Sequence, residues 1–229
     1  GTNAYWMTLA SAITKRVDAS WVVGTAQGGL DGTESVAGTP DTSTWYYIWL
    51  IARSGTGVVD ALFSESATSP TMPASYDFKR LIGAVFNNSG ANLELFTAYE
   101  TWGGGLHVSW NVPTLDIDLA STLTTARRTD AVKVPLAFSV IADLHIQIED
   151  VTSSSTNIVT CPDIADAAPS TTAAPLATLQ LSSSAVGAGG SAHHLVRTSS
   201  AGLIAARSTL ATIDQYKVST QGFHWPRRN

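Results

Sequence analysis

The chain has 229 residues, a formal net charge of −5 and only 14% charged residues. This acidic balance argues against nucleic-acid binding, which needs a basic surface to neutralise phosphates. No apolar run approaches the roughly 18 residues of a membrane-spanning helix, so membrane insertion is not expected. The single cysteine, Cys161, excludes an intrachain disulfide.

The N-terminal part of the chain contains short strand candidates separated by polar segments. Residues 5–13 and 21–23 are apolar enough to form strands, and the polar residues 15–18 between them predict a turn. Residues 24–41 are rich in Gly, Thr and Ser, a composition typical of loops with several turns.

The strongest strand pattern is the continuous apolar segment Trp45–Ala52. In an extended chain its side chains alternate between two sides, and both sides are apolar. This pattern predicts a central strand that is covered on both faces. The turn residues 54–57 predict a hairpin returning along 58–64, and a third strand is predicted over 79–86.

Two glycines of this region are predicted to serve the backbone. Gly57 ends the hairpin turn, where a positive φ is favoured. Gly83 lies inside a strand pattern, which indicates a bulge or the close approach of another segment.

Period-two alternation continues through the second half of the chain. In residues 106–112 it places His107 on the outward side, with Val112 inward. Residues 120–130 are rich in Thr and could hold one short helix, and residues 162–175 predict a crossover loop. The predicted strands here cover 93–99, 106–112, 115–119, 132–140, 144–148, 158–161, 176–181, 193–197, 203–207 and 210–219.

These patterns together predict the fold class. About a dozen short strands with regular turn signals, and no convincing 3.6-residue period, indicate an all-β protein. We expect a multi-stranded antiparallel β-sandwich or jelly-roll-like architecture. Residues 1–229 are predicted to form a single β-rich domain, with a subdivision near 112–115 as the alternative.

The segment from Thr44 to Gly83 resembles a module of bacteriophage and prophage tail-fibre proteins. That module combines Trp-Tyr, an apolar strand, Thr-Gly-x-x-Asp, a Ser/Thr-rich turn, x-Pro-x-x-Tyr and Arg-x-Ile-Gly. The matching residues are Trp45-Tyr46, Thr56-Gly57, Asp60, Met72-Pro73, Tyr76, Arg80, Ile82 and Gly83. Further similarity is found upstream at 12–16 and 28–31, and more loosely at 168–172 and around Gly222 and Trp225.

The resemblance implies a location, a set of partners and an oligomeric state. It implies a virion protein of a tail fibre or spike that is assembled in the host cytoplasm. Its partners would be other virion proteins and a host cell-surface receptor, in particular a polysaccharide. Since phage fibres are generally three-chain structures, we expect a homotrimer.

The sequence contains no Gly-x-Ser-x-Gly, phosphate-binding loop or His-Glu-x-x-His motif. We therefore expect no enzymatic activity, no cofactor and no metal site. Cys161 is interpreted as a small buried residue, because a nucleophile would need a nearby histidine. His193 and His194, adjacent on a strand, should point to opposite faces; a metal on a trimer axis is the alternative.

Pairs of carboxylates can serve as calcium ligands or as acid–base pairs. Asp116 and Asp118 lie two residues apart, on one face of a predicted strand. Too few oxygen ligands surround them for a calcium loop, so solvated strand residues are the favoured interpretation. The same interpretation applies to Glu149-Asp150 and to Asp163 with Asp166.

Among the seven tryptophans, Trp102 is the candidate binding residue because it stands beside three glycines. An exposed indole ring can stack on a sugar and donate a hydrogen bond, although core or interface packing is the alternative. Trp45, Trp49 and Trp110 are predicted to be core residues, Trp225 a packing anchor for the tail, and Trp6 and Trp21 remain open.

The sequence therefore favours a non-enzymatic structural and host-attachment module, the distal part of a phage tail fibre or spike that binds a cell-surface glycan. One alternative is a fibre-borne glycan-modifying enzyme, a depolymerase or esterase, which repeated cleavage of host polysaccharide would reveal. The other is a purely structural virion decoration, which would not bind host cells.

Overall fold

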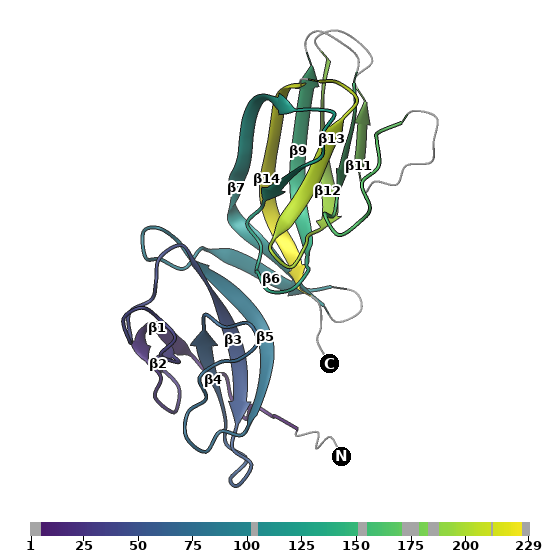
Figure 1. The fold of residues 1–229 in the computed structure, drawn as a ribbon. Helices are drawn as coiled ribbons and strands as arrows, with labels where there is room; N and C mark the ends of the chain where they lie inside the picture. The colour runs from purple at the N-terminus through teal and green to yellow at the C-terminus, as the bar shows by residue number, and fades with distance from the viewer. Residues whose placement is uncertain are drawn as a thin grey trace. The chain divides into compact units, whose positions relative to one another are not determined.

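The computed structural model describes residues 6–101, 105–150, 155–170, 179–182, 188–211 and 213–225. Within these ranges every regular element is a β-strand (Figure 1). The strands form two five-stranded sheets and one four-stranded sheet, and most neighbouring strands are antiparallel. The predicted all-β class is thus confirmed. None of the described segments forms a helix long and apolar enough to cross a membrane.

The chain divides into two compact units, of which the first ends at Glu94 and the second begins at Leu95. The sequence predicted one domain with a subdivision near 112–115. That position is wrong, because residues 112–115 lie inside the continuous strand β7 (Leu106–Leu123). The pairing of β7 with its neighbour shifts register beside this stretch, so an irregular strand, and not a linker, interrupts the alternation. The prediction that Val112 points inward is also wrong, because this irregularity leaves it 76% exposed.

Unit 1 contains one mixed sheet in the order β1-β2-β4-β3-β5. The pairs β1/β2 and β2/β4 are parallel, and the others are antiparallel. The strands are β1 (Lys15–Ser20), β2 (Gln27–Leu30), β3 (Thr44–Ala52), β4 (Val59–Ser64) and β5 (Phe78–Asn87).

The beginning of unit 1 differs from the sequence prediction. Residues 15–18 form part of β1 and not a turn, whereas residues 6–13 and 21–23 contain no strand. The loop predicted over 24–41 includes β2. The prediction failed because it relied on apolar residues to locate strands. The polar β1 is instead stabilised by the ion pair of Lys15 that is described below.

The central strand behaves largely as predicted. β3 lies between β4 and β5, and Tyr46 and Ile51, which point to opposite sides, are both fully buried. Ile48 and Leu50 are only half-buried. The strand is therefore covered on both faces, but incompletely at Ile48 and Leu50.

Both backbone glycines are where their patterns placed them. Gly57 has a φ of 70° in the turn between β3 and β4, as predicted. In the β3/β5 ladder Ile48 pairs with Gly83 and Trp49 pairs with Leu81, so Ile82 is an extra residue. Gly83 therefore lies beside a β-bulge, which confirms that prediction.

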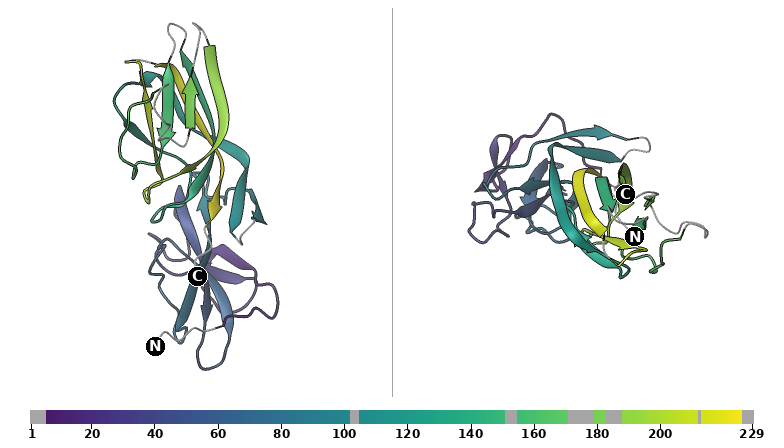
Figure 2. Two further views of the ribbon diagram at one scale, coloured as in Figure 1. Left: turned by 90° about the vertical axis from the view of Figure 1, so that its right-hand side faces the viewer. Right: turned by 90° about the horizontal axis from the view of Figure 1, so that it is seen from above.

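Unit 2 is an antiparallel sandwich of two sheets, which Figures 1 and 2 show as facing layers. One sheet has the order β12-β9-β14-β7-β6 and the other β11-β10-β13-β8. Besides β7, the strands are β6 (Phe96–Glu100), β8 (Arg128–Ala131), β9 (Ile141–Asp150), β10 (Thr156–Thr160), β11 (Leu179–Ser182), β12 (Ala188–Arg197), β13 (Leu203–Ser208) and β14 (Ile213–Trp225).

Two predictions for unit 2 are wrong. Residues 120–130 hold no helix, because they form the end of β7 and the start of β8. Residues 132–140 are not a strand, although Val132, Val134 and Phe138 are buried as the alternation predicted. Pro135 lacks an N–H, so an irregular segment buries these side chains without a sheet ladder.

The tryptophans contribute mainly to packing. Trp49 and Trp110 are buried as predicted, while Trp45 is half-buried. Trp225 is 5% exposed and packs edge-on against Phe138, with ring centroids 4.9 Å apart, which confirms its role as an anchor. Trp6 is exposed.

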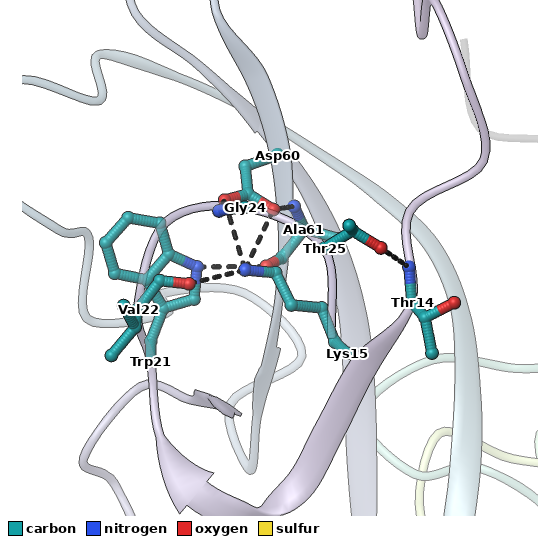
Figure 3. Close-up of polar contacts among 8 residues, drawn as sticks. All are labelled: Thr14, Lys15, Trp21, Val22, Gly24, Thr25, Asp60 and Ala61. Carbon is teal, nitrogen blue, oxygen red and sulfur yellow. Dashed lines mark hydrogen bonds and ion pairs between the residues drawn. The ribbon is translucent and has the colours of Figure 1, made fainter. Parts of the chain in front are cut away.

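A buried ion pair joins β1 to β4 of unit 1's sheet (Figure 3). Nζ of Lys15 lies 3.0 Å from Oδ1 of Asp60, and their side chains are only 2% and 1% exposed. The backbone N–H groups of Gly24 and Ala61 donate to the carboxylate, and Lys15 donates to the carbonyl oxygen of Val22 at 2.6 Å. The two charges are therefore surrounded by hydrogen bonds, which a buried pair requires.

Aromatic rings cover this ion pair. Nζ of Lys15 lies 5.1 Å from the centroid of the Trp21 ring, and Trp21 donates its indole N–H to the carbonyl oxygen of Ala61 at 3.0 Å. The Tyr76 ring meets Trp21 edge-on at 5.2 Å, and the Arg53 guanidinium lies over Tyr76 at 4.7 Å. Trp21 thus acts as a structural residue.

We predict that Lys15→Met strongly destabilises unit 1. The substitution leaves the Asp60 carboxylate buried without its counter-charge, and breaking such a pair typically costs about 3–5 kcal/mol. Because the backbone N–H groups of Gly24 and Ala61 still donate to the carboxylate, we expect the loss of stability to lie near the lower end of this range. Hydrogen exchange of the β3 and β4 amides should accelerate accordingly.

The matched control is Arg16→Met, which removes an exposed charge from the next residue of β1. Exposed pairs contribute at most about 1 kcal/mol, so little change is expected. Equal effects of the two variants would show that the buried pair does not support the unit.

Candidate functional site

The candidate binding residue Trp102 lies outside the described residues, so its exposure stays a prediction. Cys161 is fully buried as a free cysteine, which confirms its interpretation as a small packed residue. His193 is exposed and His194 is half-buried on the opposite face of β12, as predicted for adjacent strand residues.

The carboxylates singled out in the sequence do not form a pair-based site. Asp116 accepts hydrogen bonds from the Lys133 backbone N–H at 3.1 Å and from the Thr220 hydroxyl. Burial raises the pKa of Asp116. Its interpretation as a solvated residue is therefore wrong, whereas the exposed Asp118 forms an ion pair with Lys217 at 3.2 Å.

The remaining acidic candidates are also explained by structure. Asp150 is buried, 1% exposed, which corrects its solvated interpretation, and Glu149 is half-buried on the other face of β9. Asp166 pairs with Arg207 at 2.9 Å, and Asp163 is exposed. None of these residues therefore indicates an acid–base pair.

The outer face of the five-stranded sheet of unit 2 carries the densest group of polar and aromatic side chains. Cross-strand pairing aligns one residue from each strand in a single row that crosses the whole sheet. In the order β12, β9, β14, β7, β6 these residues are Arg197, Ile141, His224, His107 and Tyr99. Paired residues of neighbouring strands project from the same face, so all five lie together.

Asp143 lies at the centre of this face. Its Oδ2 is 3.1 Å from Nε2 of His107, and its Oδ1 faces Nε2 of His193 at ion-pair distance. The His107 ring is sandwiched by His224 and Tyr99, with centroids 4.4 and 4.8 Å away. One carboxylate therefore organises imidazoles from strands on both sides of it.

A glycine makes this arrangement possible. Gly222 of β14 pairs with Asp143 on one side and with Ser109 on the other. A Cβ atom at Gly222 would lie 2.1 Å from the Val108 carbonyl oxygen. Since β14 separates β7 from β9 and carries no side chain here, His107 reaches Asp143 across it.

We call this surface the Asp143 face. It is defined by Tyr99, His107, Ile141, Asp143, His145, His193, Leu195, Arg197 and His224. Tyr99 is 52% exposed, Leu195 and Ile141 are each 43% exposed, and the side chain of His193 is 62% exposed. Asp143 and His107 are buried beneath them. The face thus combines an exposed aromatic and apolar rim with a buried polar centre.

The electrostatics of the face are dominated by its imidazoles. Burial lowers the pKa of His224, the neighbouring His107 lowers it further, and the Asp143 carboxylate opposes these effects. Across the described part of the chain, no group of three or more His, Cys, Asp or Glu side chains is arranged to hold a metal ion. The geometry suits hydrogen bonding and ring stacking with a ligand.

No family model, curated protein or solved structure matches the chain. The geometry of the Asp143 face and the resemblance in the sequence are therefore the observations that bear on function.

Sequence reasoning placed His107 on the outward side of its strand but missed the cluster. Alternation shows on which side a residue lies, whereas only the strand order and register bring His107, Asp143 and His193 together. The one available signal was Gly222, because a glycine inside a strand marks close backbone approach, but the predicted strand ended at residue 219 whereas β14 extends to Trp225.

A second group of ionisable side chains lies in unit 1. Glu34 is 7% exposed, and neither of its carboxylate oxygens has a partner within hydrogen-bond geometry among the described residues. Nearby, the Tyr46 hydroxyl donates to Oε1 of Glu65 at 2.9 Å. Burial raises the pKa of Glu34, and the carboxylates of Asp31 and Glu65 raise it further, while backbone N–H groups offset this in part.

We predict that Glu34→Gln stabilises unit 1 near pH 7. The native Glu34 binds its proton more tightly than the unfolded chain does, so stability falls as pH rises from about 4.5 through the raised pKa. The glutamine variant does not lose stability in this way. Its urea midpoint, measured by circular dichroism, should exceed that of the native protein at pH 7, and the difference should vanish below about pH 4.5.

Asp18→Asn serves as the control because Asp18 is exposed on β1. It should give no gain at pH 7. A destabilised Glu34→Gln variant at pH 7 would contradict the interpretation of Glu34 as a buried, unsatisfied carboxylate.

We also predict that Asp143→Asn lowers the pKa of His224 further below its ordinary value. The carboxylate is the one group that opposes burial and His107 at this ring, so its removal leaves the lowering effects alone. Titration of the imidazole protons by NMR measures the shift. Asp118→Asn, which removes an exposed carboxylate of β7, should leave His224 unchanged; equal shifts would refute the coupling.

Proposed function

We propose that the chain is a non-enzymatic structural and host-attachment module, the distal part of a phage tail fibre or spike, and that its Asp143 face binds a cell-surface polysaccharide. The virion location rests on the resemblance to tail-fibre modules. The binding role rests on one observation, the exposed ring of Tyr99 and side chain of His193 around a buried carboxylate.

The part of the chain that carries the resemblance supports a scaffold role for unit 1 and a binding role for unit 2. Its densest part, from about residue 13 to Gly83, falls within unit 1. There Asp60 and Tyr76 belong to the buried ion-pair region, and Gly57 forms a turn. These residues have structural roles, so unit 1 is suited to be a scaffold and unit 2 to carry the contact.

The chemistry of the Asp143 face supports a sugar ligand. Aromatic rings stack on the apolar faces of sugars, and imidazole, guanidinium and carboxylate groups hydrogen-bond their hydroxyls. Tyr99 and His193 stand at the two edge strands of the sheet, β6 and β12, on one face. A chain of several sugar residues could therefore contact both.

Among the described residues, the His107–Asp143 contact favours the alternative, a fibre-borne depolymerase or esterase. A histidine oriented by a carboxylate is half of a hydrolytic triad. However, the His107 ring is covered by Tyr99 and His224, which limits its access to a substrate. We therefore favour binding without turnover.

We also propose that the module assembles as a homotrimer, as the resemblance implies. Sedimentation at low micromolar concentration should give three times the chain mass of 24.0 kDa. A stable monomer would reject the trimer and weaken the fibre assignment.

The proposed function predicts that fluorescently labelled protein adsorbs to susceptible host cells. Periodate oxidation of the cell-surface sugars should abolish adsorption. Tyr99→Ala should weaken it about tenfold, the equivalent of ~1.4 kcal/mol, because it removes a stacking ring.

Val112→Ala is the matched control, since Val112 is a 76% exposed apolar residue elsewhere in the same sheet. Absence of adsorption would favour a purely structural decoration. Continued release of reducing ends or acetate from host polysaccharide, lost in His107→Gln, would instead establish the enzyme.

A further inference from the structure

We propose that the ligand of the Asp143 face is an anionic polysaccharide, bearing uronate or phosphate groups, and that the face binds it more tightly as the pH falls from 7.5 to 5.5. This inference rests on the proposed function and specifies the chemical class of its ligand.

The exposed charges on this face are mainly positive or can become so. Arg197 and His193 lie two positions either side of Leu195 on β12, so both project from the same face. His145 pairs directly with His193 across the β9/β12 ladder, and Arg197, His193 and His145 are all exposed. An anionic group would thus meet a guanidinium and two imidazoles within one small area.

The central carboxylate does not repel such a ligand. The side chain of Asp143 is only 10% exposed, and its two oxygens face His107 and His193. A ligand therefore meets N–H groups at the surface, while the negative charge below is balanced by imidazoles.

The remaining ionisable groups of this sheet face lie farther along the strands. Asp118 is occupied by Lys217 in an ion pair, and Glu149 is half-buried four residues beyond His145. Taken by strand, the ionisable groups on this face of the sheet are Tyr99 of β6, His107 and Asp118 of β7, His224 and Lys217 of β14, Asp143, His145 and Glu149 of β9, and His193 and Arg197 of β12.

Arg197 makes oxyanions the preferred ligand. Guanidinium presents its N–H donors in a planar fork that matches the two oxygens of a carboxylate or phosphate. Its position at the end of the row that contains Tyr99 and His224 allows one sugar chain to reach both the arginine and the aromatic rings.

The direction of the pH effect follows from the histidines. Histidine is the side chain that changes charge between pH 5 and 8. On acidification Asp143 can neutralise one imidazolium, and burial lowers the pKa of His224, so charge gained at the exposed imidazoles is what adds to that of Arg197. Uronate and phosphodiester groups stay negative over this range, and the attraction therefore increases.

Binding of the full chain can be measured by calorimetry with three probes of matched length: oligogalacturonate, polyglycerol phosphate and neutral dextran. We expect at least one anionic probe to bind, with an affinity at least fivefold higher at pH 5.5 than at pH 7.5, and dextran to bind at least tenfold more weakly. Which anionic probe binds separates a uronate from a phosphate ligand. Added salt should weaken binding.

Two variants test the residues. Arg197→Gln should lower affinity for the anionic probe about tenfold at both pH values, and His145→Gln should reduce the pH dependence. Arg16→Gln, which removes an exposed arginine from unit 1, is the control and should change neither. Circular dichroism verifies that each variant is folded.

The inference is overturned if dextran binds as well as both anionic probes, if neither anionic probe binds, or if Arg197→Gln behaves like Arg16→Gln. Where the protein still adsorbs to host cells in a periodate-sensitive manner, such a result leaves the proposed function intact and rejects only the anionic ligand. Loss of adsorption itself rejects the function.

Discussion

The architecture of unit 1 depends on the buried ion pair between Lys15 and Asp60. Two charges that are 2% and 1% exposed are costly to remove from water, and their attraction offsets this cost only when the surrounding hydrogen bonds are complete. Backbone groups of residues 22–24 supply part of this shell, so the loop after β1 is held in place by the same pair. The pair thus specifies where a polar strand must lie.

Glycines allow this polar strand to approach the sheet. The short strand β2 lies between β1 and β4, and it contains Gly28 and Gly29. A Cβ atom would lie 2.1 Å from the Ser20 carbonyl oxygen at Gly28, and 2.8 Å from the Phe63 ring at Gly29. Without side chains there, Lys15 can reach Asp60 past β2. Several residues that carry the tail-fibre resemblance are therefore explained by packing, and they indicate a scaffold more than a binding surface.

Unit 2 uses its five-stranded sheet in two different ways. The inner face packs apolar side chains such as Leu144, Ile146 and Phe223, all fully buried, into the sandwich. The outer face gathers imidazoles around Asp143, and Gly222 opens the space through which they meet. Successive residues of each strand point to opposite faces. A substitution on the outer face can therefore change the candidate binding surface without changing the packed core.

The sequence by itself determined the all-β class, the central strand Trp45–Ala52, the turn at Gly57 and the bulge at Gly83. These features depend on local alternation and on backbone freedom, which neighbouring residues encode. Only the tertiary structure decided the boundary after Glu94, the strand β1 and the meeting of His107, Asp143 and His193. Period-two alternation assigns each side chain to a side of its strand, but it does not specify which strand lies next to it or in what register. Contacts between distant segments, including a buried ion pair and a shared carboxylate, follow from that register alone.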